Sequence, residues 1–381
     1  MKKIKNVEQN WGIAILLICF CLISCLAIYA ATHTLYYVKM QLIWYIIGSI
    51  AIILLMQFND EKLWKIAPYA YLLGIFLLII VLFFGTTIGG AKRWINLGIM
   101  NFQTSEVMKL ALIIFLARVV TAHNRAYLNR TFKSDSFLLL KIGVISLVPI
   151  VLVMLQPDLG TTIVFLALIA GITLVSGITW KLLFPIFASF FSIFGGLFYL
   201  VLAHREWLYK IGFHAYQFDR VDTWLNPYSD MSGNSYQLTQ SLKAIGSGGM
   251  FGKGLAVSEV VVPENHTDFI FTVIGENFGF IGGCLLLLLY FVLIYRFIVT
   301  IFGTKNEFYS YIVTGTVMLI CFHIFENIGM TIGILPVTGI PLPFISYGGS
   351  SLLGNMIATG LVLAMNYQHK EYPFSKKHQL F

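Results

Sequence analysis

The chain has 381 residues, of which 58% are hydrophobic and 11% are charged, and its formal net charge is +8. Soluble domains carry roughly a quarter charged residues, so this composition excludes an ordinary water-soluble protein. Apolar runs of about 20 residues, the length that crosses a bilayer as a helix, recur along the chain, whereas the short alternating strands of a membrane β-barrel do not. The sequence therefore predicts an all-α, polytopic membrane protein in which residues 1–381 form a single integral membrane domain.

Ten membrane-spanning helices are expected, the first of which is an uncleaved N-terminal helix rather than a signal peptide. The predicted spans are 12–32, 41–58, 66–84, 104–121, 137–155, 160–177, 181–203, 268–299, 308–328 and 350–367. Lys and Arg gather in the loops on the side of the termini, so the positive-inside rule places both termini in the cytoplasm. The positive charge then indicates anchoring to anionic lipid and not nucleic-acid binding. Residues 204–267 become a large extracytoplasmic loop.

The first outer loop with unusual chemistry is "TTIGGAKRWINLG" at 86–98. Its glycines could expose backbone N–H groups beside Lys92 and Arg93, which together would hold a phosphate or diphosphate. The alternative is a flexible loop with an interfacial cation and Trp94 as a membrane anchor.

The predicted fourth span opens with "FQTSEVMKLALIIFLA" at 102–117, where Thr104 or Ser105 can cap the helix. Glu106 and Lys109 are three residues apart, so they share a helix face and can pair. An ionisable residue inside a membrane costs about 2.5–3.5 kcal/mol on insertion scales and tends to face a bundle interior or a wet cavity. The pair is therefore either part of a polar cavity or a structural ion pair.

The outer boundary between the fifth and sixth spans is "LQPDLGTTIVF" at 155–165. Pro157 ends one helix, and Asp158 can cap the next. Asp158 is thus either a simple helix cap or a further acidic group of the outer site.

The long outer segment ends in "SYQLTQSLKAIGSGGMFGKGL" at 235–255, which predicts a short helix near 236–245 that carries Lys243. The glycines after it are numerous enough to bring the backbone close to a ligand or to another helix. The spacing is not that of a P-loop, because Gly follows the Lys, so a soluble nucleotide site is not expected.

The stretch "PENHTDFIFTVIGENFGFIGG" at 263–283 places acidic groups at the start of the eighth span. Asp268 and Glu276 are eight residues apart, so a continuous helix would carry both on one face, with Glu276 about 12 Å deeper. Asp268 could be a general base, a metal ligand or a cap. His266 has no second His or Cys nearby and does not predict a zinc site.

The stretch "GILPVTGIPLPFISYGGSS" at 333–351 contains three prolines and cannot be one continuous helix. Irregular backbone at membrane depth is tolerated only where it is buried in protein or lines a polar cavity. We therefore expect a broken or re-entrant segment beside the site, with Ser350 and Ser351 able to cap the last span. Glu326 and Asn327 lie on the span just before this segment.

Taken together, these segments resemble the SEDS family of RodA, FtsW and SpoVE, and they occur in the family's order. The segments that carry the resemblance are "GAKRWINLG", "FQTSEVMK", "QPDLGTT", "SYQLTQSLKAIGSGGMFGKG", "ENHTDFIFTVIGE" and "LPVTGIPLPFISYGGSS". The resemblance covers nearly the whole chain, and several motifs in order are far more specific than any one of them. The "KRWINLG" wording and the short N-terminus are similar to the RodA branch.

The resemblance implies a peptidoglycan glycosyltransferase that polymerises lipid II at the outer face of the cytoplasmic membrane of a bacterium, for cell elongation and rod shape. It implies a class B penicillin-binding protein as transpeptidase partner, together with other membrane proteins of the elongation complex. It also implies a divalent cation, Mg²⁺ or Mn²⁺.

The family's essential acid falls on Asp268, as catalytic group or metal ligand, its cavity pair on Glu106 and Lys109, and its loop Arg-Trp on Arg93 and Trp94. Two positions depart from the family wording: Thr104 stands where Pro is common, and Asn277 where a second Glu is common. The residues expected to bind substrate or line its cavity are Lys92, Arg93, Trp94, Glu106, Lys109, Asp158, Arg220, Lys243, Glu276, Ser346 and Ser350.

The implied chemistry fits these groups. The C4 hydroxyl of an acceptor sugar attacks the C1 of a sugar linked to undecaprenyl diphosphate. A carboxylate such as Asp268 can accept the proton, and Arg93, Arg220 or a metal can stabilise the leaving diphosphate. Two alternatives remain. A flippase for the lipid-linked precursor would use Glu106, Lys109 and Glu276 as a polar path, and a scaffold for a penicillin-binding protein would not need Asp268.

Overall fold

The computed structural model describes residues 2–88, 91–96, 98, 101–210, 215–228, 235–303 and 306–371. Every one of the ten predicted spans coincides with a helix. These helices are α1 (Lys2–Thr32), α2 (Leu35–Leu55), α3 (Asp60–Phe84), α4 (Thr104–Ala126), α5 (Phe132–Met154), α6 (Leu159–Val175), α7 (Trp180–Ala203), α11 (Ile270–Gly303), α12 (Glu307–Thr331) and α13 (Gly349–Glu371). The outer segment adds α8 (Arg205–Lys210), α9 (Ala215–Leu225) and α10 (Tyr236–Ser247), the last of which confirms the short helix expected near 236–245.

Seven of the described helices are long and apolar enough to cross a membrane by length and composition. The other three helices at predicted spans are too short or too highly charged to be included. Helix α4 carries charged side chains along its length, and α6 and the apolar part of α13 are shorter than 18 residues. The chain is therefore a polytopic all-α membrane protein.

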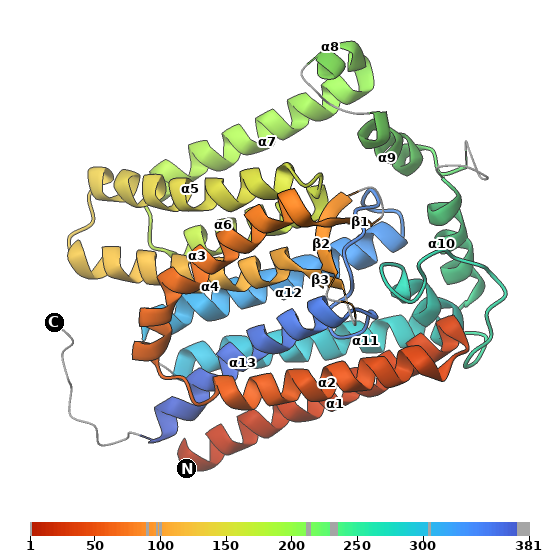
Figure 1. Cartoon of the computed structure of the whole chain (residues 1–381), viewed down its shortest axis with the longest axis horizontal. Coiled ribbons are helices and arrows are strands. Elements are labelled where there is room, and N and C mark those ends of the chain that lie inside the picture. The colour runs from red at the N-terminus through yellow and green to blue at the C-terminus, as the bar shows by residue number, and fades with distance from the viewer. Residues whose placement is uncertain are drawn as a thin grey trace.

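The helices run side by side, and α1 begins where α13 ends, at one end of the bundle (Figure 1). The start of α1 and the end of α13 therefore lie on the same side, as an even number of spans requires. Among the seven helices that are long and apolar enough to span a membrane, α12 is the most buried, and it packs against α4, α6, α11 and α13. Helix α7 leans away from the bundle and buries only Leu183 within it, so its apolar surface faces lipid (Figure 1).

A small antiparallel sheet lies at the opposite end of the bundle, at residues for which the sequence predicted a loop. It consists of β1 (Thr86–Ile88), β2 (Ala91–Asn96) and β3 (Asn101–Gln103), in that order. Trp94 in β2 is paired with a residue on each neighbouring strand, Thr86 on β1 and Gln103 on β3. The β-branched and aromatic residues of this stretch suit a half-buried strand.

Strand β3 runs directly into α4, which changes how this helix starts. Gln103 takes the cap position, and its backbone N–H donates to Ser350 Oγ at 3.2 Å. The expected caps by Thr104 or Ser105 are therefore wrong. The expected cap of α13 by Ser350 is also wrong, because Ser350 Oγ bonds to β3, donating to Asn101 O at 3.3 Å.

The segment between α12 and α13 is non-helical at residues 332–348, which confirms the predicted broken segment. Its carbonyl oxygens, which could not stay unpaired at membrane depth, accept hydrogen bonds from side chains of the surrounding helices. The pairs are Asn327 to Ile340, Tyr290 to Pro343, Tyr45 to Phe344, Ser24 to Ile345 and Gln41 to Ser346. Donors from α1, α2, α11 and α12 thus fix this segment as a rigid wall.

Helix α11 is broken at Gly279, whose φ of 65° and ψ of −163° are not helical. The glycine-rich stretch after α10 fills the break: Lys253 N donates to Glu276 O at 2.9 Å, and Phe280 N donates to Gly249 O at 2.9 Å. A Cβ on Gly252 would lie 2.2 Å from Asn277 O. The glycines therefore serve close approach to another helix, one of the two uses the sequence predicted.

The predicted eighth span coincides with α11, but the expected shared face of Asp268 and Glu276 is wrong. Helix α11 begins at Ile270, so Asp268 lies in the preceding turn and does not share a helical face with Glu276. Glu276 Oε1 instead accepts from Lys253 Nζ at 2.9 Å and from Glu259 N at 3.1 Å. The carboxylate thus holds the glycine-rich stretch against α11.

Candidate active site

A cavity of about 1110 Å³ opens at the end of the bundle that carries the sheet and α8–α10. Its walls come from the sheet, the starts of α2, α4 and α6, helices α9 and α10, the turn before α11 and the broken segment. Eight of the residues predicted from the sequence line it: Arg93, Trp94, Glu106, Lys109, Asp158, Arg220, Asp268 and Ser350. These eight residues come from six segments far apart in the sequence, which thus meet around one polar space.

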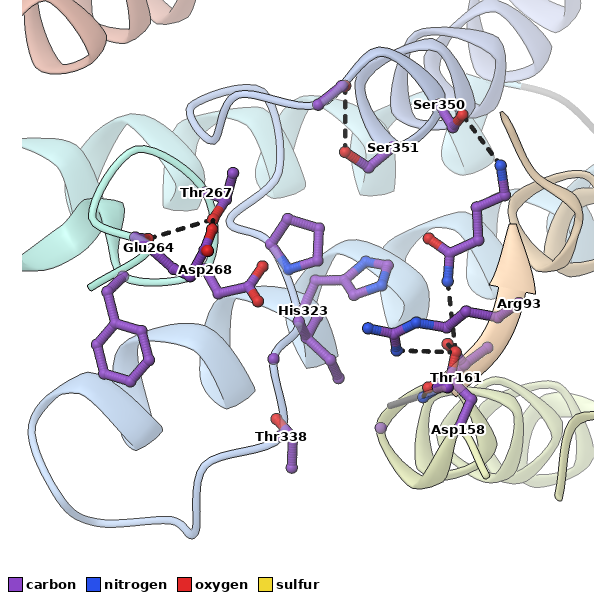
Figure 2. Close-up of a pocket in the computed structure, with 18 of the residues that line it drawn as sticks. Arg93, Asp158, Thr161, Glu264, Thr267, Asp268, His323, Thr338, Ser350 and Ser351 are labelled. Carbon is purple, nitrogen blue, oxygen red and sulfur yellow. Dashed lines mark hydrogen bonds and ion pairs between the residues drawn. The ribbon is translucent and has the colours of Figure 1, made fainter. Parts of the chain in front are cut away.

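Asp268 projects into this cavity from the turn before α11 (Figure 2). Its main-chain oxygen accepts from Asn327 Nδ2 at 2.6 Å, and the preceding carbonyl, Thr267 O, accepts from Ser346 Oγ at 2.6 Å. Burial raises the pKa of Asp268 to about 7, with smaller raising effects from Glu264 and Asp158, while Arg93 and Arg220 lower it. A carboxyl group poised near neutrality is suited to accept a proton during a reaction.

Arg93 faces Asp268 from the opposite wall, as Figure 2 shows. Its guanidinium pairs with Asp158 at 3.2 Å, and the side chain of Asp158 is only 3% exposed. Asp158 also caps α6, as predicted, by accepting from Thr161 N at 3.1 Å and from Thr161 Oγ1 at 2.9 Å. One buried carboxylate therefore both starts α6 and orients the cation that faces Asp268.

The floor of the cavity lies between α4 and α12. The predicted pair forms, with Lys109 Nζ 2.9 Å from Glu106 Oε1, and both side chains are buried. Lys109 Nζ also lies 3.2 Å from His323 Nε2, on α12. Because these groups line the cavity, the ion pair is also part of its polar surface, so the two readings of the sequence are not exclusive.

Comparison with known proteins identifies the chain. Residues 8–371 match the family described as "Cell cycle protein", which groups FtsW, RodA and SpoVE. The chain belongs to the FtsW/RodA/SpoVE family. Among curated relatives it is similar to peptidoglycan glycosyltransferase MrdB of Escherichia coli K12, at 38% identity over 328 residues that cover 85% of this chain and 84% of that protein.

Solved structures give the same family. The chain is similar to one described under "Structural coordination of polymerization and crosslinking by a peptidoglycan synthase complex", with TM-score 0.78, 26% identity, and coverage of 95% of this chain and 98% of that chain. It is also similar to the rod shape determining protein RodA of Thermus thermophilus, with TM-score 0.69, 27% identity, and coverage of 94% and 97%.

Four predicted residues of this FtsW/RodA/SpoVE-family protein lie outside the cavity lining. Lys92 Nζ donates to Phe83 O at 2.9 Å, in the last turn of α3, while the neighbouring Arg93 lines the cavity. Lys243 is exposed on α10, and Glu276 pairs with Lys253. Ser346 is buried, accepts from Leu342 N and donates to Thr267 O, so it supports the turn of Asp268 from outside the cavity.

Two residues of α12 that the sequence did not single out as site residues are functional candidates. His323 contacts Lys109, and Asn327 joins the Asp268 turn to the broken segment through Ile340 O at 2.7 Å. The signal was present in "HIFEN", because polar groups inside an apolar span tend to face a cavity or a partner. Their partners could not be named, since they lie on α4, before α11 and in the broken segment.

The residues can be tested against the divalent cation that the family implies. Among the described residues, no group of three or more His, Cys, Asp or Glu side chains is close enough to hold a metal ion by itself. Mg²⁺ in phosphate chemistry is usually held by one or two carboxylates together with substrate phosphates and water. The half-buried carboxylate of Asp268 fits that pattern of ligands.

Proposed function

We propose that the protein is a peptidoglycan glycosyltransferase that joins lipid II units into glycan strands. One observation carries the proposal: the carboxylate of Asp268, with its pKa raised to about 7, faces the Arg93 guanidinium across a cavity at the membrane surface. Membership in a family with a curated relative named peptidoglycan glycosyltransferase MrdB, at 38% identity, supports it.

The reaction needs one displacement at an anomeric carbon. Asp268 removes the proton from the C4 hydroxyl of the acceptor sugar as that oxygen attacks C1 of the donor sugar. The bond from C1 to the lipid diphosphate breaks, and the α linkage of the donor becomes a β-1,4 bond. The diphosphate leaves as an anion, which Arg93 and Arg220 stabilise because both line the cavity.

Asp158 keeps Arg93 in place for this task. Its own carboxylate is fixed by the start of α6, so the guanidinium is oriented before substrate binds. Such preorganised charges stabilise a developing anion without further rearrangement. The alternative role of Asp268 is to hold a divalent cation, Mg²⁺ or Mn²⁺, which would supply positive charge for the leaving diphosphate.

The setting of the reaction follows from the same resemblance. The cavity end of the bundle is the outer face of the bacterial cytoplasmic membrane, and the termini are cytoplasmic. A class B penicillin-binding protein supplies crosslinking, in line with a solved neighbour described by polymerization and crosslinking in one synthase complex. The similarity to a rod shape determining protein favours elongation over division.

The test is polymer formation from labelled lipid II by the purified protein, with and without a class B penicillin-binding protein, resolved by product length. Wild type with Mg²⁺ should form polymer, chelation should stop it, and Asp268→Ala should form none. The matched control is Glu61→Ala, an exposed carboxylate at the other end of the bundle. Equal polymer from Asp268→Ala would support the scaffold hypothesis instead. Transport of lipid II without polymer formation would support the flippase hypothesis.

A further inference from the structure

An aromatic cluster lies at the edge of the cavity beside Asp268. It consists of Tyr36 and Tyr37 at the start of α2, His266 in the turn before α11, and Tyr347 at the end of the broken segment. The Tyr37 ring is 5.0 Å from the Tyr347 ring at 84° and 5.2 Å from the His266 ring, and Tyr36 is 5.4 Å from Tyr37. Three segments far apart in the sequence thus place their rings together; we call these four residues the aromatic rim.

The aromatic rim is tied to the turn that carries Asp268. Tyr347 N donates to His266 O at 2.9 Å, and the neighbouring Ser346 Oγ donates to Thr267 O at 2.6 Å. The rim and Asp268 therefore keep a fixed mutual position. Tyr36 and Tyr347 also line the cavity, and 64% of Tyr36 is exposed, so its ring is available to a ligand.

Charge is distributed unevenly around the cavity. Among the described residues, the Lys and Arg side chains that line it are Arg93, Lys109 and Arg220, which come from β2, α4 and α9. The wall formed by α2 and residues 347–351 contributes Tyr36, Met40, Trp44, Tyr347, two glycines and two serines to the lining. An anionic diphosphate therefore has its partners on one side, and the rim side suits an uncharged group.

A pyranose ring matches the rim side by its chemistry. Its C–H face is apolar and packs on the face of an aromatic ring, while its hydroxyl groups bond to phenol oxygens, since tyrosine offers a large apolar body and a polar end. Tyrosines that only anchor a protein in the headgroup region have no reason to converge on one cavity. Two rings of the rim, those of Tyr36 and Tyr347, line the cavity, and Tyr347 is hydrogen-bonded to the turn that carries Asp268.

We propose that the aromatic rim is the subsite for the acceptor sugar, an uncharged N-acetylated hexosamine whose C4 hydroxyl faces Asp268. This assignment rests on the proposed glycosyltransferase function. Tyr36 and Tyr347 contact the sugar, and Tyr37 and His266 support their rings from behind. The lipid diphosphates bind on the opposite side, at Arg93 and Arg220.

The experiment separates the two substrates. A lipid II analogue with its terminal C4 hydroxyl inverted serves only as donor. A labelled analogue whose C1–diphosphate bond is replaced by a non-cleavable linkage serves only as acceptor, and the initial rate of coupling is measured while each is varied in turn. Tyr36→Ala and Tyr347→Ala should each raise the half-saturating acceptor concentration about tenfold. The half-saturating donor concentration and the maximal rate should stay within about threefold, and Tyr36→Trp should retain acceptor binding.

A matched control variant makes the result decisive. Phe84→Ala removes an exposed aromatic side chain, 82% exposed, from the same end of the bundle but outside the cavity lining. An unchanged acceptor dependence in both tyrosine variants, an equal change for donor and acceptor, or the same change in Phe84→Ala would overturn the proposal in favour of a general lipid-surface role. Absence of coupling by wild type would instead overturn the proposed function itself.

Discussion

Asn327 on α12 donates its side-chain amide to the main-chain oxygen of Asp268 at 2.6 Å, and the same nitrogen reaches Ile340 O at 2.7 Å. A fully buried side chain thus joins the catalytic turn to the irregular wall of the cavity. Ser346 Oγ and Tyr347 N also join these segments, through Thr267 O and His266 O, but Asn327 makes the contact at Asp268 itself. Asn327 is therefore a positioning residue that acts through Asp268.

Asn327→Leu keeps the size of the side chain and removes both donors. Each carbonyl left unpaired costs about 1–3 kcal/mol, so the thermal unfolding temperature should fall. The maximal rate of polymerisation should fall about 100-fold, because a small displacement of a reacting group costs that much. Rates per folded molecule are measured with lipid II after size-exclusion chromatography.

The matched control for this change is Asn124→Leu on α4. Asn124 Nδ2 donates to Tyr311 OH at 2.8 Å, at the other end of the bundle. It should lower stability and leave the rate per folded molecule near that of wild type. Similar losses of rate in both variants would show that Asn327 acts on stability alone.

Most of the fold can be predicted from the sequence, because span length and hydrophobicity are local properties. The ten spans, the α6 cap at Asp158 and the pairing of Glu106 with Lys109 all follow from spacing within one segment. The break at Gly279 and the sheet at 86–103 depend on tertiary partners, the stretch after α10 and the start of α13. The same long-range packing decides which of the predicted site residues meet in the cavity, so this could not be predicted from the sequence.

The pH dependence of activity should report the ionisation of Asp268. Its pKa is raised to about 7, chiefly by burial, and only the ionised carboxylate accepts a proton. The value of kcat/KM, which reports groups of the free enzyme, should therefore rise with pH up to about 7 and then level off. A flat profile between pH 5.5 and 8 would contradict the assignment of Asp268 as base.

The same raised pKa has an effect on stability with a definite sign. Between the ordinary aspartate value of 3.8 and about 7, the folded state binds the proton more tightly than the unfolded chain does. Stability contributed by this group is therefore lost as pH rises through that window. Asp268→Asn should match wild type in unfolding temperature at pH 4 and exceed it at pH 8, as followed by thermal scans in detergent.

Arg93 should control the position of the pH profile. It lowers the pKa of Asp268, so Arg93→Met should raise that pKa and shift the midpoint of the kcat/KM profile to higher pH. The neighbouring Lys92→Met is the control, since Lys92 lies outside the cavity lining. A shift of the same size in both variants would mean that general surface charge, and not the facing guanidinium, sets the pKa.

The ion pair on the cavity floor should show strong coupling. Lys109→Met leaves the buried carboxylate of Glu106 without its cation, which costs about 3–5 kcal/mol of stability. The double change of Lys109→Met with Glu106→Gln removes both charges and should recover most of that loss. Denaturation of the single and double variants measures the coupling, and additive losses would show that the two groups do not interact.

The glycine-rich stretch that fills the break in α11 should tolerate a methyl group at one glycine and not at another. Gly252 has φ +80°, and a Cβ there would lie 2.2 Å from Asn277 O, so Gly252→Ala should cost at least about 1–3 kcal/mol and lower activity. Gly246→Ala is the control, because no atom lies within 4 Å of its Cβ position. It lies in α10, where alanine favours the helix, so it should be neutral or stabilising. Thermal unfolding and the polymerisation rate of both variants test this, and equal losses would mean that the stretch is not packed against α11.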